Sequence, residues 1–253
     1  MTEETLAFYR REGDAYKATG LGVSPWNDQA QMGVALAGLA AHCLEQIPSP
    51  APMLTTRLTI DIMGTVPPVG LTPVNRIIRE GSRMQLVEVS LEADGRSWVR
   101  ATASRIRTQQ SPEISNPATR GFPPEGRDPS LPRATKWAET ILLEGGFHQT
   151  GPGAQWVHFT SCVVAGEQLK PLERLAMIAD FGSGIAPILP VKEWTQANTD
   201  ISLHISRTSK DEWLLIDASS ESAGNGIAVV HSRISDRDGA IGMAHQSVFL
   251  NQR

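Results

Sequence analysis

The chain has 253 residues, of which 40% are hydrophobic and 20% are charged, and its formal net charge at pH 7 is −4. This composition is ordinary for a globular protein, and it lacks the basic excess that nucleic-acid-binding proteins usually carry. No apolar run approaches the ~20 residues of a membrane-spanning helix. Cys43 and Cys162 are too few and too far apart for a zinc site or a disulfide framework. We therefore expect a cytoplasmic protein without nucleic-acid, membrane or metal partners.

The first half of the chain predicts one helix between a short strand region and four longer strands. Residues 5–26 form the short strand region and end in a turn. From 29 to 47 hydrophobic residues recur at helical spacing, and Asn27 or Asp28 is the expected N-cap. Small residues make this helix slim enough to lie close to a sheet, namely Ala37, Gly38, Ala40 and Ala41. Pro48 ends the helix, and strand-like runs follow at 55–63, 71–79, 84–92 and 97–107.

The segment from 109 to 134 carries six prolines and little hydrophobic periodicity. Such a composition predicts a linker without a long helix or strand. The second half then repeats the order of the first, with strand-like runs, a helix from about 172 to 189, and four strands. These last strands are expected at 200–207, 212–222, 226–235 and 240–250. We therefore predict a domain at 1–108, a linker at 109–134 and a domain at 135–253.

The two halves share an internal repeat. The alternating runs 57–62 and 200–205 align at an offset of 143, and a period of two is typical of a half-buried strand. Asp94-Gly95 aligns with Asp238-Gly239 at an offset of 144. An Asp-Gly pair between two alternating runs predicts a hairpin turn, because glycine supplies the positive φ. The chain therefore reads as one unit that has been duplicated.

Several short segments, in their order and spacing, resemble the acyl-CoA thioesterase II family. They are Ser24-Pro25-Trp26, Gln31-Met32-Gly33, Arg57-Leu58-Thr59-Ile60-Asp61, Arg79-Glu80-Gly81-Ser82-Arg83, Ala179-Asp180, Thr199-Asp200-Ile201-Ser202 with Arg207, Glu212-Trp213-Leu214, and Asp238-Gly239 with Gln246. The resemblance implies a double hotdog, an α+β fold in which two fused helix-wrapped antiparallel sheets form a pseudo-dimer. It also implies an acyl-CoA substrate, hydrolysis by an activated water, and no cofactor.

The resemblance also implies catalytic residues in the second half. A catalytic aspartate starts the first long strand of that half, at Asp200, and a catalytic glutamine lies on the last strand, at Gln246. A third position holds Thr or Ser in the best-known branch of the family. Here it falls on Glu221, between Ser220 and Ser222.

These residue types suit thioester hydrolysis. A carboxylate such as that of Asp200 can act as general base for a water, or orient it, and the amide of Gln246 can hold the same water. Unpaired backbone N–H groups at the start of the first helix, Gln31-Met32-Gly33, can bind the oxyanion. Arg207 is a candidate for binding coenzyme A phosphates. The 144-residue offset would point Gln246 outward unless a β-bulge intervenes.

Only the second half carries the aspartate and the glutamine, since Arg57 and Thr102 take the matching places in the first half at these offsets. One competent site per chain is therefore expected. Two other functions stay open: a protein that binds acyl thioesters without cleaving them, because the third position is Glu221, and an enoyl-CoA hydratase or dehydratase. The latter would need His204 or His245 to face the substrate. Exposed sheet edges predict a homodimer, and the activity implies a role in lipid metabolism.

Overall fold

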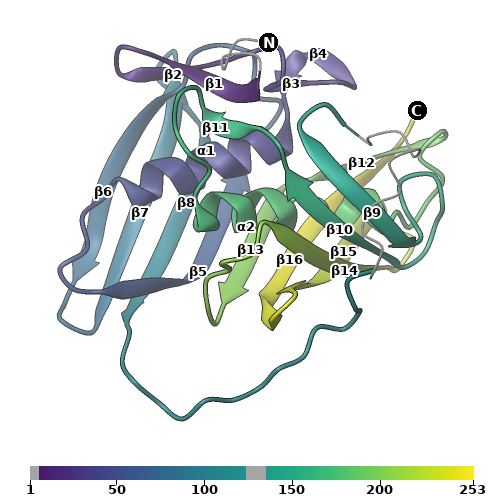
Figure 1. Cartoon of the computed structure of the whole chain (residues 1–253). Coiled ribbons are helices and arrows are strands. Elements are labelled where there is room, and N and C mark those ends of the chain that lie inside the picture. Colours follow the sequence, from purple (N-terminus) through teal and green to yellow (C-terminus); the bar gives the residue numbers. More distant parts are fainter. Residues whose placement is uncertain (1–5, 124–134) are drawn as a thin grey trace. The chain divides into compact units, whose positions relative to one another are not determined.

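Figure 1 shows the computed structural model of the chain, which describes residues 6–123 and 135–253. The chain forms two compact units. The first unit comprises the chain up to Gln110 together with Ser161–Met177, and the second comprises Ser111–Thr160 and Ile178–Arg253. A segment from the second half of the sequence, containing β11 (Cys162–Val164) and most of α2 (Pro171–Ala179), therefore packs in the first unit.

The first unit is built on one helix against an antiparallel sheet with the strand order β6-β7-β8-β5. The helix α1 (Gly33–Glu45) packs on the inward face of β7 and β8, as Figure 1 shows. Along β7 every second residue is buried, which is the expected result of period-two patterning. The four predicted strands are confirmed as β5 (Met53–Ile62), β6 (Thr72–Glu80), β7 (Met84–Ala93) and β8 (Arg96–Arg107).

The first helix starts later than the sequence predicts. Residues before it form β4 (Asn27–Gln31), which pairs with β3 (Val23–Ser24). Asn27 does not cap the helix, because its side-chain oxygen accepts the backbone N–H of Gln29 within the β3–β4 ribbon. Met32 takes the N-cap position without a side-chain hydrogen bond, so the predicted cap at Asn27 or Asp28 is wrong.

A buried polar pair helps to fix α2 in the first unit. His42 of α1 and Glu173 of α2 are each 1% exposed, and the distance from Nδ1 to Oε1 is 2.9 Å. The other carboxylate oxygen of Glu173 accepts the backbone N–H of Lys170 at the start of α2. Beside them, β11 pairs in parallel with β1 (Ala7–Glu12), and β1 pairs with β2 (Ala15–Ala18).

The face of α1 with small side chains packs against β11 and α2 at Gly38. A Cβ atom at Gly38 would lie 2.9 Å from Cγ2 of Val163 and 3.1 Å from Cγ of Met177. Real Cβ contacts are longer, so the helix can approach β11 and α2 this closely only with glycine at that position. The small residues of α1 therefore serve packing.

Substituting Gly38→Val should lower the free energy of unfolding by about 1–3 kcal/mol, the usual effect of adding volume to a filled core. Denaturant titration of the variant and the parent protein measures this difference. Gly184→Ala is the matched control, because nothing lies within 4 Å of a Cβ at Gly184. The control should change stability by less than about 1 kcal/mol. An unchanged stability of Gly38→Val would contradict the packing assigned to α1.

The second unit has the strand order β13-β16-β15-β14-β10-β9, with β12 also paired to β16. The strands are β9 (Ala138–Glu144), β10 (Gly153–Phe159), β12 (Trp194–Asn198), β13 (Asp200–Ile205), β14 (Trp213–Ser222), β15 (Ile227–Asp236) and β16 (Gly239–Gln252). The predicted helix at 172–189 is divided by a turn at Asp180 and Phe181 into α2 and the short α3 (Gly182–Ile185). Gly182 and Gly184 are poor helix formers, and α3 packs on β14, β15 and β16.

The predicted linker has no helix or strand over 109–123, which confirms that part of the prediction; residues 124–134 lie outside the described residues. The segment is nevertheless bound to the second unit. Asn116 accepts the backbone N–H of Ala240, and Gly121 accepts the indole N–H of Trp156. Phe122 adds an edge-to-face contact with the same tryptophan.

Both units contain a bulge on their last strand at equivalent positions. In the first unit the register between β7 and β8 shifts at Leu91, so that Trp98 has no partner on β7. In the second unit the register between β15 and β16 shifts at Ile234, so that Ile241 has no partner on β15. Trp98 and Ile241 are 143 residues apart. After a bulge, the alternation of inward and outward side chains is shifted by one residue. This shift therefore occurs at the same place in β8 and β16.

The hairpin turns explain why the sequence also suggested an offset of 144. Asp94-Gly95 forms the turn of the first unit, because Ala93 pairs with Arg96. In the second unit Asp236 pairs with Gly239, so the two turn residues are Arg237 and Asp238. The Asp-Gly alignment was therefore wrong by one residue. With the offset of 143, the counterpart of Gln246 is Ala103 and not Thr102.

Candidate active site

Gln246 points inward, towards the helical side of the sheet in the second unit. It is 1% exposed, and Ser220, Val230 and Gln246 lie opposite one another on β14, β15 and β16. The bulge at Ile241 places Gln246 on this face, which resolves the question that the sequence left open. Gly182 of α3 lies against it, since a Cβ there would be 2.7 Å from Oε1 of Gln246.

The amide of Gln246 holds the turn between α2 and α3. Its Oε1 accepts the backbone N–H of Ser183 at 3.0 Å, and its Nε2 donates to the backbone carbonyl of Asp180 at 3.3 Å. An amide nitrogen has two hydrogens and an amide oxygen has two lone pairs. One donor and one acceptor site of Gln246 therefore remain for another partner.

Asp180 lies in this turn and shares the inward face with Gln246. Its Oδ1 accepts a hydrogen bond from Nδ2 of Asn198, the last residue of β12, at 2.6 Å. Burial raises the pKa of the Asp180 carboxyl to about 6, against the lowering effect of the Asn198 bond. The residue keeps a partly exposed surface. Among the described residues no second hydrogen bond reaches its carboxylate.

Asp200 occupies a second bulge, between β12 and β13. Its Oδ1 accepts the backbone N–H of Ser247 at 2.9 Å, which replaces a backbone acceptor at the break in the strand. Along β13, Ile201 is buried, and strand alternation places Asp200 with Ser202 on the opposite, outward face. No hydrogen bond joins Asp200 to Gln246 in the part of the chain that the structure describes.

Glu221, at the third catalytic position that the resemblance implies, lies at the solvent-exposed end of β14. Glu221 is exposed and lies opposite Val229, which is itself 40% exposed. The neighbouring Ser220 points inward, and its hydroxyl donates to the backbone carbonyl of Ala186 at 2.5 Å. Of the residues considered for this position, Ser220 is the one in the inward row with Gln246.

The histidines required by a hydratase lie on the outward face. His204 is exposed. His245 and His231 are cross-strand neighbours with their Nδ1 atoms 3.0 Å apart. Burial lowers the pKa of His245, and the nearby His231 and His204 lower it further. Within the described ranges, no three or more His, Cys, Asp or Glu side chains form a group that could hold a metal ion.

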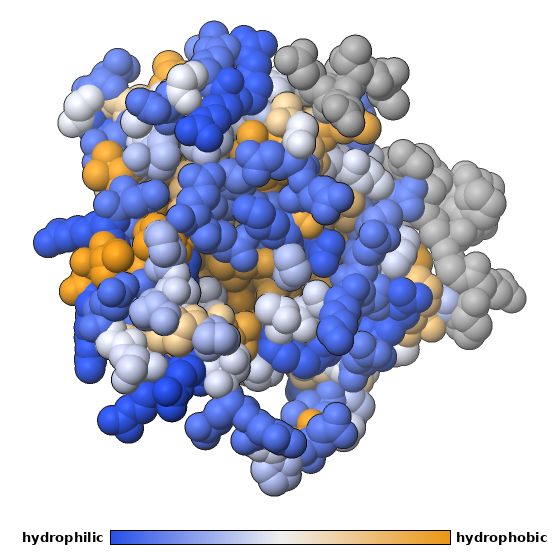
Figure 2. All heavy atoms as spheres, turned by 60° about the vertical axis from the view of Figure 1, so that its left-hand side comes forward, coloured by the Kyte–Doolittle hydropathy of each residue, from blue (hydrophilic) through white to orange (hydrophobic). Residues whose placement is uncertain are grey.

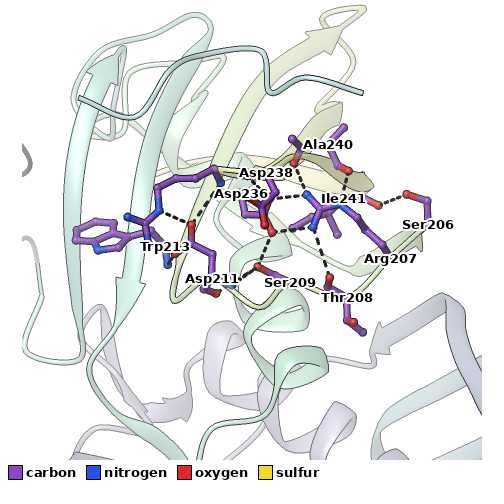
Figure 3. Close-up of polar contacts among 12 residues, drawn as sticks. Ser206, Arg207, Thr208, Ser209, Asp211, Trp213, Asp236, Asp238, Ala240 and Ile241 are labelled. Carbon is purple, nitrogen blue, oxygen red and sulfur yellow. Dashed lines mark hydrogen bonds and ion pairs between the residues drawn. The ribbon is translucent and has the colours of Figure 1, made fainter. Parts of the chain in front are cut away.

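Arg207 is fully engaged within the second unit (Figure 3). Its guanidinium bonds both carboxylate oxygens of Asp236, which is 0% exposed, and also the backbone carbonyls of Thr208, Gly239 and Ala240. These bonds use all five of its N–H donors. Binding of a coenzyme A phosphate by Arg207 stays a prediction, and it would require one of these bonds to break.

The start of α1 lies in the first unit. Gln31 is 5% exposed; its Oε1 accepts the hydroxyl of Tyr9, and its Nε2 donates to the carbonyls of Pro67 and Val69. Both amide hydrogens of Gln31 are therefore used in structural bonds. The N–H groups of Gly33, Val34 and Ala35 precede the first helical hydrogen bond, which runs from Leu36 to the carbonyl of Met32, and no acidic residue occupies that turn. The oxyanion role of this helix start stays a prediction.

The sequence matches two family models in succession. Residues 23–106 match the acyl-CoA thioesterase N-terminal domain, and residues 109–250 match the acyl-CoA thioesterase C-terminal domain. The chain therefore belongs to the acyl-CoA thioesterase family, whose members are hydrolases that cleave acyl-CoA thioesters. No curated protein sequence matches the chain. None of the helices in the described ranges combines the length and hydrophobicity needed to cross a bilayer.

Solved structures show the same fold. The acyl-CoA thioesterase II TesB2 from Mycobacterium marinum has a TM-score of 0.72 and 17% identity, over 100% of this chain and 98% of that one. A TesB protein from Mycobacterium avium subspecies paratuberculosis gives 0.70 and 15%, over 98% of each chain. A hotdog-fold protein of unknown function from Alicyclobacillus acidocaldarius gives 0.75 and 14%, over 98% and 97%. The predicted double hotdog fold is thus confirmed.

Proposed function

We propose that the acyl-CoA thioesterase activity of this chain resides in the second unit, around Asp200 and Gln246. The observation that carries the proposal is the difference between the two copies of the repeat. At the offset of 143, the places of Asp200 and Gln246 are taken by Arg57 and Ala103 in the first unit. An arginine and an alanine cannot act as a base and a water-holding amide. One catalytic centre per chain follows.

In this proposal Asp200 is the base or the water-orienting carboxylate, and from its place at the break between β12 and β13 its side chain has to reach around the strand edge to the water that Gln246 holds on the inward face. Its Oδ1 is bound by the Ser247 N–H, which fixes the orientation of the group and leaves Oδ2 for water. Gln246 would place its remaining amide hydrogen on the inward side, beside the turn between α2 and α3. Water attacks the thioester carbonyl carbon, and the coenzyme A thiolate leaves when the carbon–sulfur bond breaks.

Thiol release from a series of acyl-CoA substrates of increasing chain length tests this function. We expect stoichiometric release of coenzyme A and free acid with at least one chain length. A protein that only binds acyl thioesters would show acyl-CoA affinity without thiol release. A hydratase would convert an enoyl-CoA and release no thiol. Either of these results would overturn the proposed function.

The third catalytic position can be assigned by comparing two neighbours. We propose Ser220, because its hydroxyl lies inward and Glu221 is exposed. Ser220→Ala should lower kcat by about tenfold, which corresponds to ~1.4 kcal/mol in the barrier. Glu221→Ala should change kcat by less than about twofold, since an exposed carboxylate makes little difference to a buried centre. Parallel kcat measurements on the best acyl-CoA substrate decide between them, and the opposite order would assign the position to Glu221.

We further propose a cytoplasmic homodimer with a role in lipid metabolism. The free thiols of Cys43 and Cys162 fit a reducing compartment. The strand β6 ends the sheet of the first unit, and Val74, Ile77 and Ile78 on it are 45–49% exposed. Figure 2 shows hydrophobic side chains at the surface of the side that is turned forward from Figure 1. An exposed apolar edge strand favours pairing with a second copy, which sedimentation velocity can measure.

A further inference from the structure

We propose that His231 and His245 form a binding site for a divalent transition metal, of the Ni²⁺, Cu²⁺ or Zn²⁺ class, on the outward face of the second unit. The two imidazoles ligate the ion through their Nδ1 atoms. His245 and Gln246 are consecutive on β16, so their side chains point to opposite faces of the sheet. The metal site is therefore separate from the proposed catalytic centre, and the inference does not depend on the proposed function.

The sheet holds the two histidines against each other. They occupy directly opposite places on β15 and β16, and side chains in such places have their Cβ atoms about 4.5–5.5 Å apart. Both strands lie inside the sheet, since β14 flanks β15 and β13 flanks β16. Both side chains are half-buried, and their rings meet edge to face with centroids 5.2 Å apart. The backbone therefore positions the pair before any ligand binds.

The separation of the Nδ1 atoms suits a shared metal ion. They lie 3.0 Å apart. With metal–nitrogen bonds of ~2.0–2.1 Å, two nitrogens are about 3.3 Å apart on a tetrahedral ion and about 2.9 Å apart at neighbouring corners of a square-planar one. The observed distance lies between these two values. Chelation therefore requires mainly that the rings turn about χ2, which is a soft torsion in histidine.

A metal ion takes the place of a proton between the two rings. Two neutral imidazoles in this arrangement form one hydrogen bond, in which one ring donates Nδ1–H and the other accepts. When the ion binds, the donating ring carries its proton on Nε2 instead, and both Nδ1 lone pairs bond to the metal. The pKa of His245 is lowered by burial and further by His231 and His204, which favours the neutral ring that binding requires.

The neighbours on the outward face define the rest of the site. Arg233 on β15 and His204 on β13 are its cationic or titratable neighbours, and Asp217 and Glu221 on β14 are its acidic ones. No third His, Cys, Asp or Glu completes a metal-binding group in the ranges that the structure covers, so water fills the remaining positions. Imidazole suits Ni²⁺, Cu²⁺ and Zn²⁺, whereas Mg²⁺ and Ca²⁺ prefer oxygen ligands.

The duplicated fold does not require histidines at these positions. At the offset of 143, the counterparts of His231 and His245 are Glu88 and Thr102, which also lie opposite one another, on β7 and β8. Glu88 forms an ion pair with Arg100, and the Thr102 hydroxyl lies within hydrogen-bond distance of another threonine hydroxyl. Ordinary polar contacts thus satisfy the same places in the first unit. The imidazole pair adds a binding capacity that the sheet itself does not need.

Calorimetric titration of the metal-free, untagged protein with nickel chloride and with zinc chloride tests the site. We expect one tightly bound ion per chain at pH 7.5, and no comparable binding of Mg²⁺. His231→Gln and His245→Gln should each weaken the affinity by more than about tenfold, since even outer-shell partners of a metal are worth that much. His204→Gln is the matched control, because it removes an exposed imidazole from the same face. It should change the affinity by less than about threefold, since exposed charges act weakly.

Two further measurements identify the ligand atoms in the parent protein itself. The affinity should fall by more than about tenfold between pH 7.5 and pH 5.5, because protons compete with the metal for both imidazoles. Nitrogen NMR spectra of the imidazole rings with Zn²⁺ should show two of the six histidines with the metal on Nδ1 and the proton on Nε2. These spectra test the assignment even if a variant fails to fold.

Each outcome decides the inference. A parent protein that binds neither Ni²⁺ nor Zn²⁺ would overturn it, and so would full affinity in either His231→Gln or His245→Gln. A loss in His204→Gln as large as in those variants would overturn the assignment to two histidines. The titrations contain no acyl-CoA, so the result stands whether or not the protein releases thiol.

Discussion

Asp200→Asn should reduce the rate of thiol release by roughly 10²–10⁴, the usual range for loss of general acid–base help. Asparagine keeps the shape of the side chain and can still accept the Ser247 N–H, so the bulge between β12 and β13 should persist. The loss should appear in kcat more than in KM, because the carboxylate acts on the transition state. Steady-state kinetics with the best acyl-CoA substrate, with acyl-CoA binding measured in parallel, check this result.

Companion variants sharpen the same test. Gln246→Ala should do similar damage, and the double variant should be little worse than either single one, because groups that act as a unit are non-additive. Arg57→Ala is the matched control, since Arg57 occupies the place of Asp200 in the first unit. Its rate should stay within a few-fold of the parent. Near-normal turnover of Asp200→Asn would remove Asp200 from the mechanism.

The largest effect on stability is expected from Asp236→Ala. Asp236 is fully buried at the end of β15 and accepts hydrogen bonds from Arg207, Ser209 and the backbone of Asp238. Its removal leaves the guanidinium of Arg207 without its counter-charge. We expect a loss of about 2–4 kcal/mol, somewhat below the ~3–5 kcal/mol typical of a fully buried pair, because the Arg207 side chain is 34% exposed. Denaturant unfolding measures it.

A control and a pH series complete this prediction. Asp238→Ala, at an exposed turn residue, should change stability by less than about 0.5 kcal/mol. Burial of Asp236 opposes its ionisation, but the bonds from Arg207 and Ser209 prevail and lower its pKa. Its contribution is therefore present above the unfolded-state pKa of about 3.9 and is lost as the pH falls through the folded value. An Asp236→Ala protein that is as stable as its parent at pH 7 would show that the Asp236–Arg207 pair contributes nothing to the free energy of unfolding.

The strands could be predicted from the sequence, but the irregular positions could not. Alternation along 84–92 or 226–235 reflects one buried face, which is why β7 and β15 were placed within one or two residues. The bulge at Ile241 leaves no trace in residue type, since an isoleucine suits a regular strand equally well. The orientation of Gln246 depends on that one residue. The helix boundary at Gly33 was likewise decided by pairing between β3 and β4, which local spacing does not reveal.

The candidate site was predicted in part for the same reason. Asp200 and Gln246 were found through the family resemblance, whereas Asn198 was missed. Its role depends on meeting Asp180, which lies 18 residues away in the chain. Ser220 was distinguished from Glu221 only by the direction in which alternate residues of β14 point. Asp180 falls within the hydrophobic pattern that predicts the helix at 172–189, and a charge at such a position conflicts with burial.

The equivalent bulges at Trp98 and Ile241 also indicate the sequence of events in the evolution of the chain. An inserted residue at the same place in two strands, 143 positions apart, is inherited far more readily than it is acquired twice. The bulge therefore belonged to the single ancestral unit before the gene was duplicated. Ala103 and Gln246 occupy equivalent positions behind that shared bulge, so their difference arose after duplication. The two copies kept a common backbone while their side chains diverged.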